Sequence, residues 1–384
     1  MKVLFVDQLS HVEGKNAYYL ARKINHLGDD LTVELFFSIT DKNDYIHDEK
    51  TKIIFEFGDA YHGNIFKKAI AYIKSLKKIK KYIKANHVDI LVLQWFSIPW
   101  IENHFIKRVK KYCRVVTIVH DVVPFNNRVN EQSALKKIYN LSDTLVVHSK
   151  RAMSELIRLY SLKKDIEVVS GAFCDKEIYK SESKEISREN LGINKDSFVV
   201  LFYGSIRESK GLDILLEAIQ IANKKNPKVF LLAGGSLQGI SKERERVYRD
   251  LASAVNSENI GDVKFEFVPI ELEKYYFCAS DVLCLPYRNG WQSGVAQLGL
   301  VYELPIIASD IDEMKEVVLN ECNGLLFENN NPSDLANKIF YLSTNPKKQT
   351  IFKNNSSKIY MERFDLINKA KDFAEIFRKL YEPK

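Results

Sequence analysis

The chain has 384 residues, of which 46% are hydrophobic and 28% charged, and its formal net charge is +7. This length is sufficient for two domains with separate cores, and no apolar run approaches the roughly 20 residues of a transmembrane helix. The first apolar run ends early, at Asp7, which is unlike a secretory signal peptide. Five cysteines without a Cys-x-x-Cys pair disfavour a zinc site or a disulfide framework and favour reduced thiols in the cytosol.

Strands and helices alternate through the first half of the chain. The predicted strands are 2–6, 32–37, 51–56, 89–93, 115–119, 144–147 and 166–169, and the predicted helices are 15–27, 64–85, 102–111, 131–140 and 150–159. This alternation predicts a parallel sheet with crossover helices, the α/β class.

Residues 174–196 are polar and lysine-rich, and we interpret them as a hinge region. A second alternating set follows, with strands at 198–203, 229–233, 263–267, 282–285 and 305–308 and helices at 212–224, 242–256, 271–278, 294–302, 312–319 and 333–343. The tail, 347–382, has helical period. We therefore predict one domain over 1–172 and a second over 173–364, with a helix at about 365–384 that returns to the first domain.

The excess of positive charge lies in the first half, since residues 1–170 hold 28 Lys and Arg against 19 Asp and Glu. The predicted helix over 65–84 carries an apolar stripe and no acidic residue. A core-packed helix with a solvated lysine face explains the stripe, but the absence of acids favours an anionic membrane, where each Lys contributes about 1 kcal/mol. We therefore predict a cytoplasmic protein, peripheral at the inner face of the plasma membrane, with no nucleic-acid partner. The helix has eight lysines: Lys67, Lys68, Lys74, Lys77, Lys78, Lys80, Lys81 and Lys84.

Two turns in the second half suit a phosphate. In the first, Arg207 and Lys210 stand between a buried strand and a helix start. Ligands bind at the carboxyl ends of such strands, beside free helix amides. In the second turn, Ser293 can cap a helix and Gly294 would let a ligand approach the backbone. A capped helix without a ligand explains the second turn equally well.

Together these turns resemble the carboxyl-terminal half of family 4 glycosyltransferases of GT-B architecture. The matching motifs stand in the family's order across 198–327: Gly204-x-x-x-x-x-Lys210-Gly211, Ala233-Gly234-Gly235, Ser280-Asp281-Val282-Leu283-Cys284-Leu285-Pro286-Tyr287, Gln292-Ser293-Gly294-Val295, Leu304-Pro305, Glu316-Val317-Val318 and Asn323-Gly324. The first half matches more loosely, at Gly14, Val119-His120-Asp121, Val147-His148-Ser149-Lys150 and Gly171.

The chain also departs from the family pattern. Most members carry two Glu residues where this chain has Gly290 and Leu298, and an Arg where it has Ser205. A branch with Ile-Arg before the Lys-Gly pair and Gln-Ser-Gly in the later loop is more similar to this chain. In that register Arg207 supplies the cation that Ser205 cannot, whereas Leu298 cannot make the ribose contact of the second Glu.

The resemblance implies two Rossmann-like domains facing each other across a cleft. It implies a retaining hexosyltransferase that transfers a sugar from a nucleotide sugar to a glycan or lipid-linked saccharide, in cell-surface polysaccharide or glycoconjugate synthesis, with no cofactor and no metal. It implies catalytic roles for His120, Arg207 and Lys210; donor contacts from Gly204, Ser205, Gly235, Gln292, Ser293, Gly294, Val295 and Glu316; and acceptor or cleft contacts from Glu13, Gly14, Lys15, Asn16 and Trp95.

Several alternatives stay open. His120 could instead cap the turn that follows it, Trp95 and Trp100 could be packing residues, and Glu316 could pair on its own helix. Asp310-x-Asp312 mimics a metal-binding motif, but in this register we expect no metal there. Two other functions fit the same architecture: a nucleotide-sugar epimerase, and a degenerate transferase that serves a partner enzyme as a scaffold.

Overall fold

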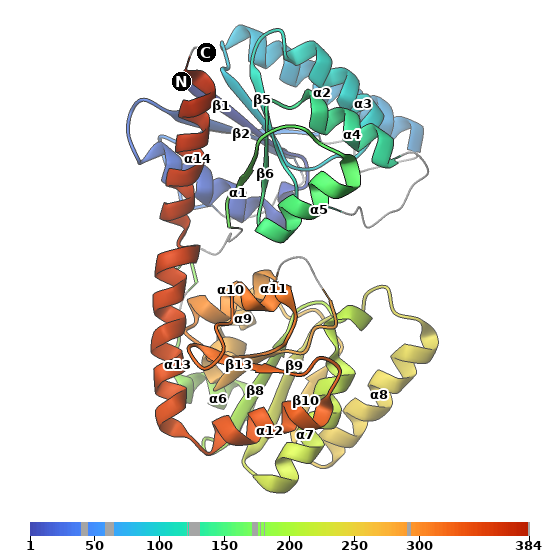
Figure 1. Cartoon of the computed structure of the whole chain (residues 1–384), viewed down its shortest axis with the longest axis vertical. Coiled ribbons are helices and arrows are strands. Elements are labelled where there is room, and N and C mark those ends of the chain that lie inside the picture. The colour runs from blue at the N-terminus through green and yellow to red at the C-terminus, as the bar shows by residue number, and fades with distance from the viewer. Residues whose placement is uncertain are drawn as a thin grey trace. The chain divides into compact units, whose positions relative to one another are not determined.

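The computed structural model describes residues 1–39, 45–57, 65–120, 122, 131–170, 176, 178–179, 181–289 and 293–382, with the backbone alone at 11–15 and 65. The chain forms two compact units. Unit 1 comprises Met1–Phe173 and Asp365–Lys384, and unit 2 comprises Cys174–Phe364. Figure 1 shows that each unit is a sheet with helices packed against it.

Within the described residues, unit 1 contains a seven-stranded parallel sheet with the order β3-β2-β1-β4-β5-β6-β7. Its strands are β1 (Lys2–Asp7), β2 (Thr32–Ser38), β3 (Ile53–Glu56), β4 (Ile90–Leu93), β5 (Arg114–Ile118), β6 (Thr144–Val147) and β7 (Ile166–Val168). The order reverses between β1 and β4. Ligands of open α/β sheets bind beside the carboxyl ends of strands at such a reversal.

The helices of unit 1 cover both faces of this sheet. They are α1 (Ser10–Asn25), α2 (Ile65–Ala85), α3 (Pro99–Val109), α4 (Glu131–Leu141), α5 (Lys150–Tyr160) and α14 (Leu366–Tyr381). Leu4 and Val6 of β1 share one core with α2 to α5. Because side chains alternate along a strand, Phe5 faces the other side, where its ring lies 6.3 and 6.1 Å from those of Phe373 and Phe377 in α14. Helix α14 also packs along α1 (Figure 1) and so completes the core of unit 1.

Within its described residues, unit 2 contains a six-stranded parallel sheet with the order β10-β9-β8-β11-β12-β13. Its strands are β8 (Phe198–Tyr203), β9 (Val229–Gly234), β10 (Gly261–Lys264), β11 (Val282–Leu285), β12 (Ile306–Ser309) and β13 (Gly324–Phe327). Its helices are α6 (Lys184–Leu191), α7 (Leu212–Lys225), α8 (Lys242–Ser257), α9 (Ile270–Ala279), α10 (Gly294–Val301), α11 (Asp312–Lys315), α12 (Pro332–Ser343) and α13 (Pro346–Ile359). Here the order reverses between β8 and β11.

The hinge predicted over 174–196 is wrong for its central part, because Lys184–Leu191 forms α6. The Ser183 hydroxyl caps this helix by accepting a hydrogen bond from Ile186 N at 3.1 Å. Arg188 is buried and its Nη2 donates to Asp281 Oδ2 at 2.8 Å. The segment is polar because it packs through an ion pair, which its composition did not reveal.

Other elements also differ from the predictions, as the following examples show. The helix predicted at 15–27 begins at Ser10, and the helix predicted at 312–319 ends at Lys315. Strand β13 was not predicted and pairs with β12 at the edge of the sheet. Its apolar run is short and is followed directly by polar residues, so the sequence shows no clear strand pattern there.

Candidate functional site

The carboxyl ends of β8 and β11 bring the two predicted phosphate turns together. Strand β8 pairs with β9 on one side and with β11 on the other, so the loops that follow β8 and β11 start from adjacent strands. The first loop holds Gly204 to Gly211, and the second leads from Pro286 to the start of α10. Sequence order alone separates these loops by a long stretch, whereas the sheet makes them neighbours.

Two glycines allow these loops to touch through their backbones. A Cβ atom on Gly211 would lie 1.9 Å from the carbonyl oxygen of Pro286, and one on Gly235 would lie 1.8 Å from that of Gly204. Gly211 also has a φ of +63°, in the left-handed region. Any side chain at either position would separate the loops that follow β8, β9 and β11.

Lys210 is held over an aromatic ring at this junction. Its Nζ lies 3.6 Å from the centre of the Tyr287 ring. The Tyr287 hydroxyl, which is buried, lies 3.2 Å from Ser293 Oγ. Ser293 in turn caps α10, because its Oγ accepts a hydrogen bond from Ala296 N at 3.2 Å. The cation is therefore fixed next to a helix start, whose first amides have no partner within the helix.

Arg207 is anchored to a different loop. Its Nη2 donates to Gln238 Oε1 at 2.9 Å, in the loop after β9. The backbones of these loops also pair, because Gln238 N donates to Ile206 O at 2.9 Å. The half-buried Ser205 lies between them. Arg207 and Lys210 thus lie on opposite sides of the loop that follows β8, with Arg207 next to the loop after β9 and Lys210 on the side of β11.

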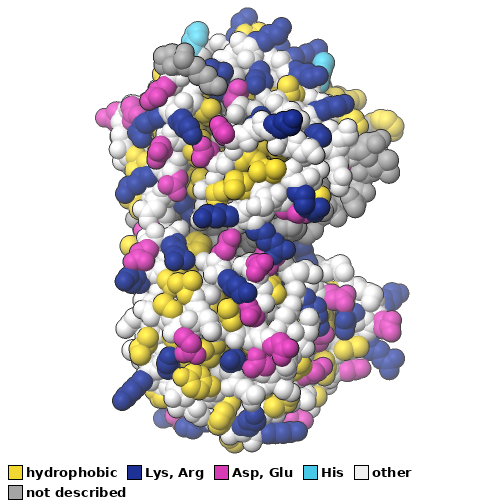
Figure 2. All heavy atoms as spheres, viewed as in Figure 1, with side chains coloured by type: hydrophobic (Ala, Val, Ile, Leu, Met, Phe, Trp, Pro, Cys, Tyr) yellow, Lys and Arg dark blue, Asp and Glu magenta, His cyan; other side chains and the backbone are white. Residues whose placement is uncertain are grey.

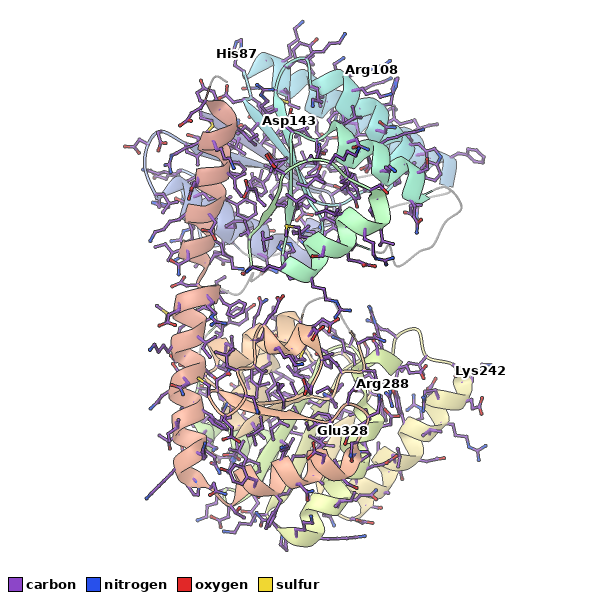
Figure 3. All side chains as sticks on the ribbon, viewed as in Figure 1. His87, Arg108, Asp143, Lys242, Arg288 and Glu328 are labelled. Carbon is purple, nitrogen blue, oxygen red and sulfur yellow. The ribbon has the colours of Figure 1, made fainter. Side chains whose placement is uncertain are left out.

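An ion-pair cluster that sequence reasoning missed ties the two phosphate turns together. Arg288, labelled in Figure 3, donates from Nη1 and Nη2 to the two oxygens of Asp213 at 2.9 and 2.8 Å. Its Nη1 also donates to Glu208 O, and its backbone N donates to Ser209 O, both at 2.8 Å. A two-bond guanidinium–carboxylate pair fixes orientation as well as distance. Asp213 lies in the first turn of α7, so Arg288 links this helix and the first turn to the second turn.

The remaining donor residues lie at the starts of α10 and after β12. A Cβ added to Gly294 would have no heavy atom of the described residues within 4 Å, and Val295 Cγ2 would lie 3.2 Å from a Cβ on Gly204. Leu298 is buried. Glu316 is exposed at the carboxyl end of α11. Gln292 and Gly290 lie outside the described residues. The Asp310 and Asp312 carboxylates lie 2.7 and 3.7 Å from Lys315 Nζ.

In unit 1, His120 follows β5 at the carboxyl edge of the sheet and packs against Trp95. The two rings are stacked, with centroids 4.3 Å apart and an interplanar angle of 12°. Gln8, at the end of β1, donates from Nε2 to Trp95 O at 2.6 Å. One face of Trp95 is therefore used for packing against His120, whereas Trp100 lies half-exposed on α3. The turn that His120 was alternatively expected to cap lies outside the described residues, apart from Val122.

His120 is hydrogen-bonded to a second histidine. Its Nδ1 lies 3.1 Å from His148 Nε2, and its Nε2 lies 3.2 Å from Gln94 Oε1. Burial, and then the neighbouring His148, holds the pKa of His120 well below its usual range. Burial, and then the Lys369 ammonium, lowers the pKa of His148 to about 4. Both rings are therefore neutral at pH 7.

The predicted acceptor contacts at 13–16 lie on a helix, because Ser10 begins α1. Glu13, Gly14 and Lys15 have helical backbone, and their side chains lie outside the described residues. Asn16 is half-buried. A glycine inside a helix is tolerated at a cost of about 1 kcal/mol, so Gly14 does not end α1.

Helix α2 presents a basic face together with exposed apolar residues. Within its apolar stripe, Leu76, Ile79 and Ile83 are buried, whereas Phe66 and Ile70 are 77% and 55% exposed. Figure 2 shows Lys and Arg side chains gathered over the part of unit 1 that holds α2 and α3. Among the described residues, no helix has the length and apolar character needed to cross a bilayer.

Comparison with known proteins gives two family matches. Residues 183–359 match Glycosyl transferases group 1, and residues 50–166 match the Glucosyltransferase 3-like, N-terminal domain. A D-inositol 3-phosphate glycosyltransferase of Saccharomonospora viridis is 24% identical over 246 residues, which are 62% of this chain and 56% of that protein. The chain thus spans little more than half the length of this relative.

Two solved structures share the fold of the whole chain. A glycosyltransferase from Rickettsia africae has a TM-score of 0.77 at 19% identity and covers 100% of this chain and 99% of its own. Anabaena HepE, solved in complex with UDP, has a TM-score of 0.73 at 18% identity and covers 99% of this chain and 100% of its own. The predicted GT-B fold, with two parallel-sheet α/β domains, is confirmed.

Proposed function

Because residues 183–359 match the glycosyl transferases group 1 family and the chain has the GT-B fold, we propose that it transfers a sugar from a nucleotide-sugar donor. The acceptor is a glycan or a lipid-linked saccharide, and the product belongs to cell-surface polysaccharide or glycoconjugate. One observation carries this proposal: Lys210 is fixed between two touching loops and a capped helix start, at the strand reversal of unit 2. The UDP complex of the HepE relative supports a nucleotide donor.

The chemistry of sugar transfer requires this kind of site. As the bond from the sugar to the diphosphate breaks, negative charge grows on the leaving oxygens. A fixed cation and helix amides that are already oriented stabilise that charge more than they stabilise the bound donor. Lys210 and the amides of Gly294 and Val295 provide them, and Arg207 joins them on leaving Gln238. These groups of the protein stabilise the negative charge on the leaving diphosphate, so the reaction needs no metal.

The family resemblance supports retention of configuration, with the leaving phosphate taking the proton of the acceptor hydroxyl. It also supports a contact from His120 to the donor sugar. Leu298 is buried and apolar, so the ribose needs another partner. The exposed Glu316 is the carboxylate that we assign to this role.

Helix α2 supports a membrane-bound acceptor. Its lysines attract anionic headgroups, while Phe66 and Ile70 would enter the apolar boundary of the bilayer. A lipid-linked saccharide would then be presented at the surface to which the enzyme binds, at the inner face of the plasma membrane.

A single assay series tests this function. Thermal shift against a panel of nucleotide sugars identifies the donor, because a ligand that binds only the native state raises its stability. The donor is then incubated with and without a lipid-linked saccharide, with EDTA present in a parallel sample. We expect transfer that needs the acceptor and survives EDTA. An epimerised donor without acceptor would favour the epimerase instead, and no turnover with any donor would favour a scaffold.

A further inference from the structure

A line of hydrogen bonds follows the carboxyl edge of the unit 1 sheet across four adjacent strands. Val169 O, after β7, lies 3.1 Å from His148 Nδ1, after β6. His148 Nε2 lies 3.1 Å from His120 Nδ1, after β5. His120 Nε2 lies 3.2 Å from the side-chain amide of Gln94, after β4. Each link joins neighbours in the strand order, so the sheet itself sets the line.

The ring nitrogens that carry protons can be assigned by starting from the Val169 carbonyl. The carbonyl of Val169 can only accept, so His148 Nδ1 donates to it. A neutral His148 then accepts at Nε2, and the proton of that bond belongs to Nδ1 of His120. A neutral His120 in turn keeps a lone pair on Nε2, which requires a donor.

Gln94 can supply that donor if the two ends of its amide are exchanged. In the structure the amide oxygen lies next to His120 Nε2, while Gln94 Nε2 is buried without a partner among the described residues. The oxygen and nitrogen of a side-chain amide are assigned from their surroundings. Exchanging them places a donor opposite His120 Nε2 and gives the buried nitrogen its hydrogen bond.

We propose that His148 is a positioning residue, which holds His120 as the neutral tautomer with its proton on Nδ1, while the amide nitrogen of Gln94 donates to Nε2. The Trp95 ring stacked on His120 fixes the plane of the imidazole. The charge of the buried Lys369 of α14 disfavours a second proton on His148. His120 therefore acts as a fixed neutral ring and neither gives up nor takes up a proton in the reaction. This consequence rests on the proposed function, whereas the tautomer does not.

Nuclear magnetic resonance of the full chain with ¹⁵N-labelled histidine tests the assignment. Two-bond couplings between ring nitrogens and carbon-bound protons identify which nitrogen carries the proton. We expect the Nδ1–H form of His120 at every pH between 5.5 and 8. A proton on Nε2, or titration of His120 in this range, would overturn the proposal.

Two variants separate positioning from packing. His148→Gln can both accept from His120 and donate to Val169, so we expect it to keep the tautomer. His148→Leu fills the space without accepting, so we expect mixed tautomers and about a tenfold lower kcat with little change in the donor KM. If His148→Leu leaves His120 as Nδ1–H, the positioning role is wrong. Should that variant fail to fold, the wild-type spectrum and His148→Gln still decide. If the spectra are as expected but no sugar is transferred to any acceptor, the proposed function is wrong and the tautomer assignment still holds.

Discussion

The ammonium of Lys210 lies 3.6 Å from the centre of the Tyr287 ring, whose hydroxyl reaches Ser293 at the start of α10. One aromatic side chain therefore connects the cation of the first phosphate turn to the helix cap of the second. Cation–π contacts of this kind contribute about 0.5–2 kcal/mol. The ring therefore orients the long side chain of Lys210.

We predict that Tyr287→Leu weakens binding of a nucleoside diphosphate about 2- to 30-fold, because Lys210 loses its platform. Tyr287→Phe keeps the ring and loses only the contact with Ser293, so it should stay within about threefold of the wild type. Isothermal titration calorimetry measures both. Equal losses in the two variants would show that the hydroxyl matters and the ring does not.

The close approach of Gly211 to Pro286 predicts a large cost for a single methyl group. Gly211→Ala places a Cβ 1.9 Å from a backbone oxygen, so the loops after β8 and β11 must separate. Gly239 is a matched control, since its φ of +62° nearly equals the +63° of Gly211 but no described residue lies within 4 Å of an added Cβ. Gly239→Ala should cost about 1–2 kcal/mol in unfolding free energy, from the left-handed backbone alone. Gly211→Ala should lower the unfolding free energy clearly more than Gly239→Ala and should abolish nucleotide binding. If urea unfolding gives similar losses of free energy for the two variants, the close contact is wrong.

The bidentate pair of Arg288 and Asp213 should couple energetically. We expect a double-mutant cycle with Arg288→Ala and Asp213→Ala to give a coupling energy of about 1–3 kcal/mol in unfolding free energy, because Asp213 is largely buried. The exposed pair Arg249–Glu245 on α8 is the control, with an expected coupling of about 0.5 kcal/mol or less. Equal coupling in the two pairs would mean that Arg288 does not hold the turns together.

Sequence patterns predicted the parts of the site that depend on neighbours in the chain. The apolar run of β8, the glycine turn and the helical period of α7 are local signals, and the structure has all three. The pairing of Arg288 with Asp213 spans 75 positions, so it needed the sheet to bring the residues together. The contact between His120 and His148 spans 28 positions and arises only because β5 and β6 are neighbours. Helix α6 was missed for a different reason, since its buried Arg188 makes the segment look like a linker.

The basic face of α2 predicts binding to anionic vesicles. Changing the exposed Lys74, Lys77 and Lys81 to Gln should weaken binding to vesicles that contain phosphatidylserine about 100-fold, at about 1 kcal/mol per lysine. The control removes the same charge from exposed lysines of unit 2: Lys195, Lys224 and Lys228. Vesicle sedimentation measures both. Equal weakening by the two sets would indicate a response to net charge and would remove α2 as the docking surface.

The buried carboxyl group of Glu102 predicts that the stability of unit 1 depends on pH. It accepts hydrogen bonds from Tyr72 Oη at 2.5 Å, Ser97 N at 2.9 Å and Ile98 N at 3.1 Å. Burial nevertheless dominates and raises the pKa of Glu102 to about 7. The native state therefore holds this proton more tightly than the unfolded chain, in which the pKa lies near 4.5.

The free energy of unfolding should therefore fall as the pH rises from about 4.5 to about 7, by about 3 kcal/mol at most, and should be insensitive to Glu102 above that range. His120 and His148 act in the opposite sense, because their lowered pKa values cost stability as the pH falls below 6.5. The difference between wild type and Glu102→Gln isolates the carboxyl group, since Gln carries no titrating proton. Urea unfolding at pH 5, 6, 7 and 8 should show that the variant loses the decline between pH 5 and 7. If wild type and variant keep a constant difference across this range, Glu102 does not titrate there.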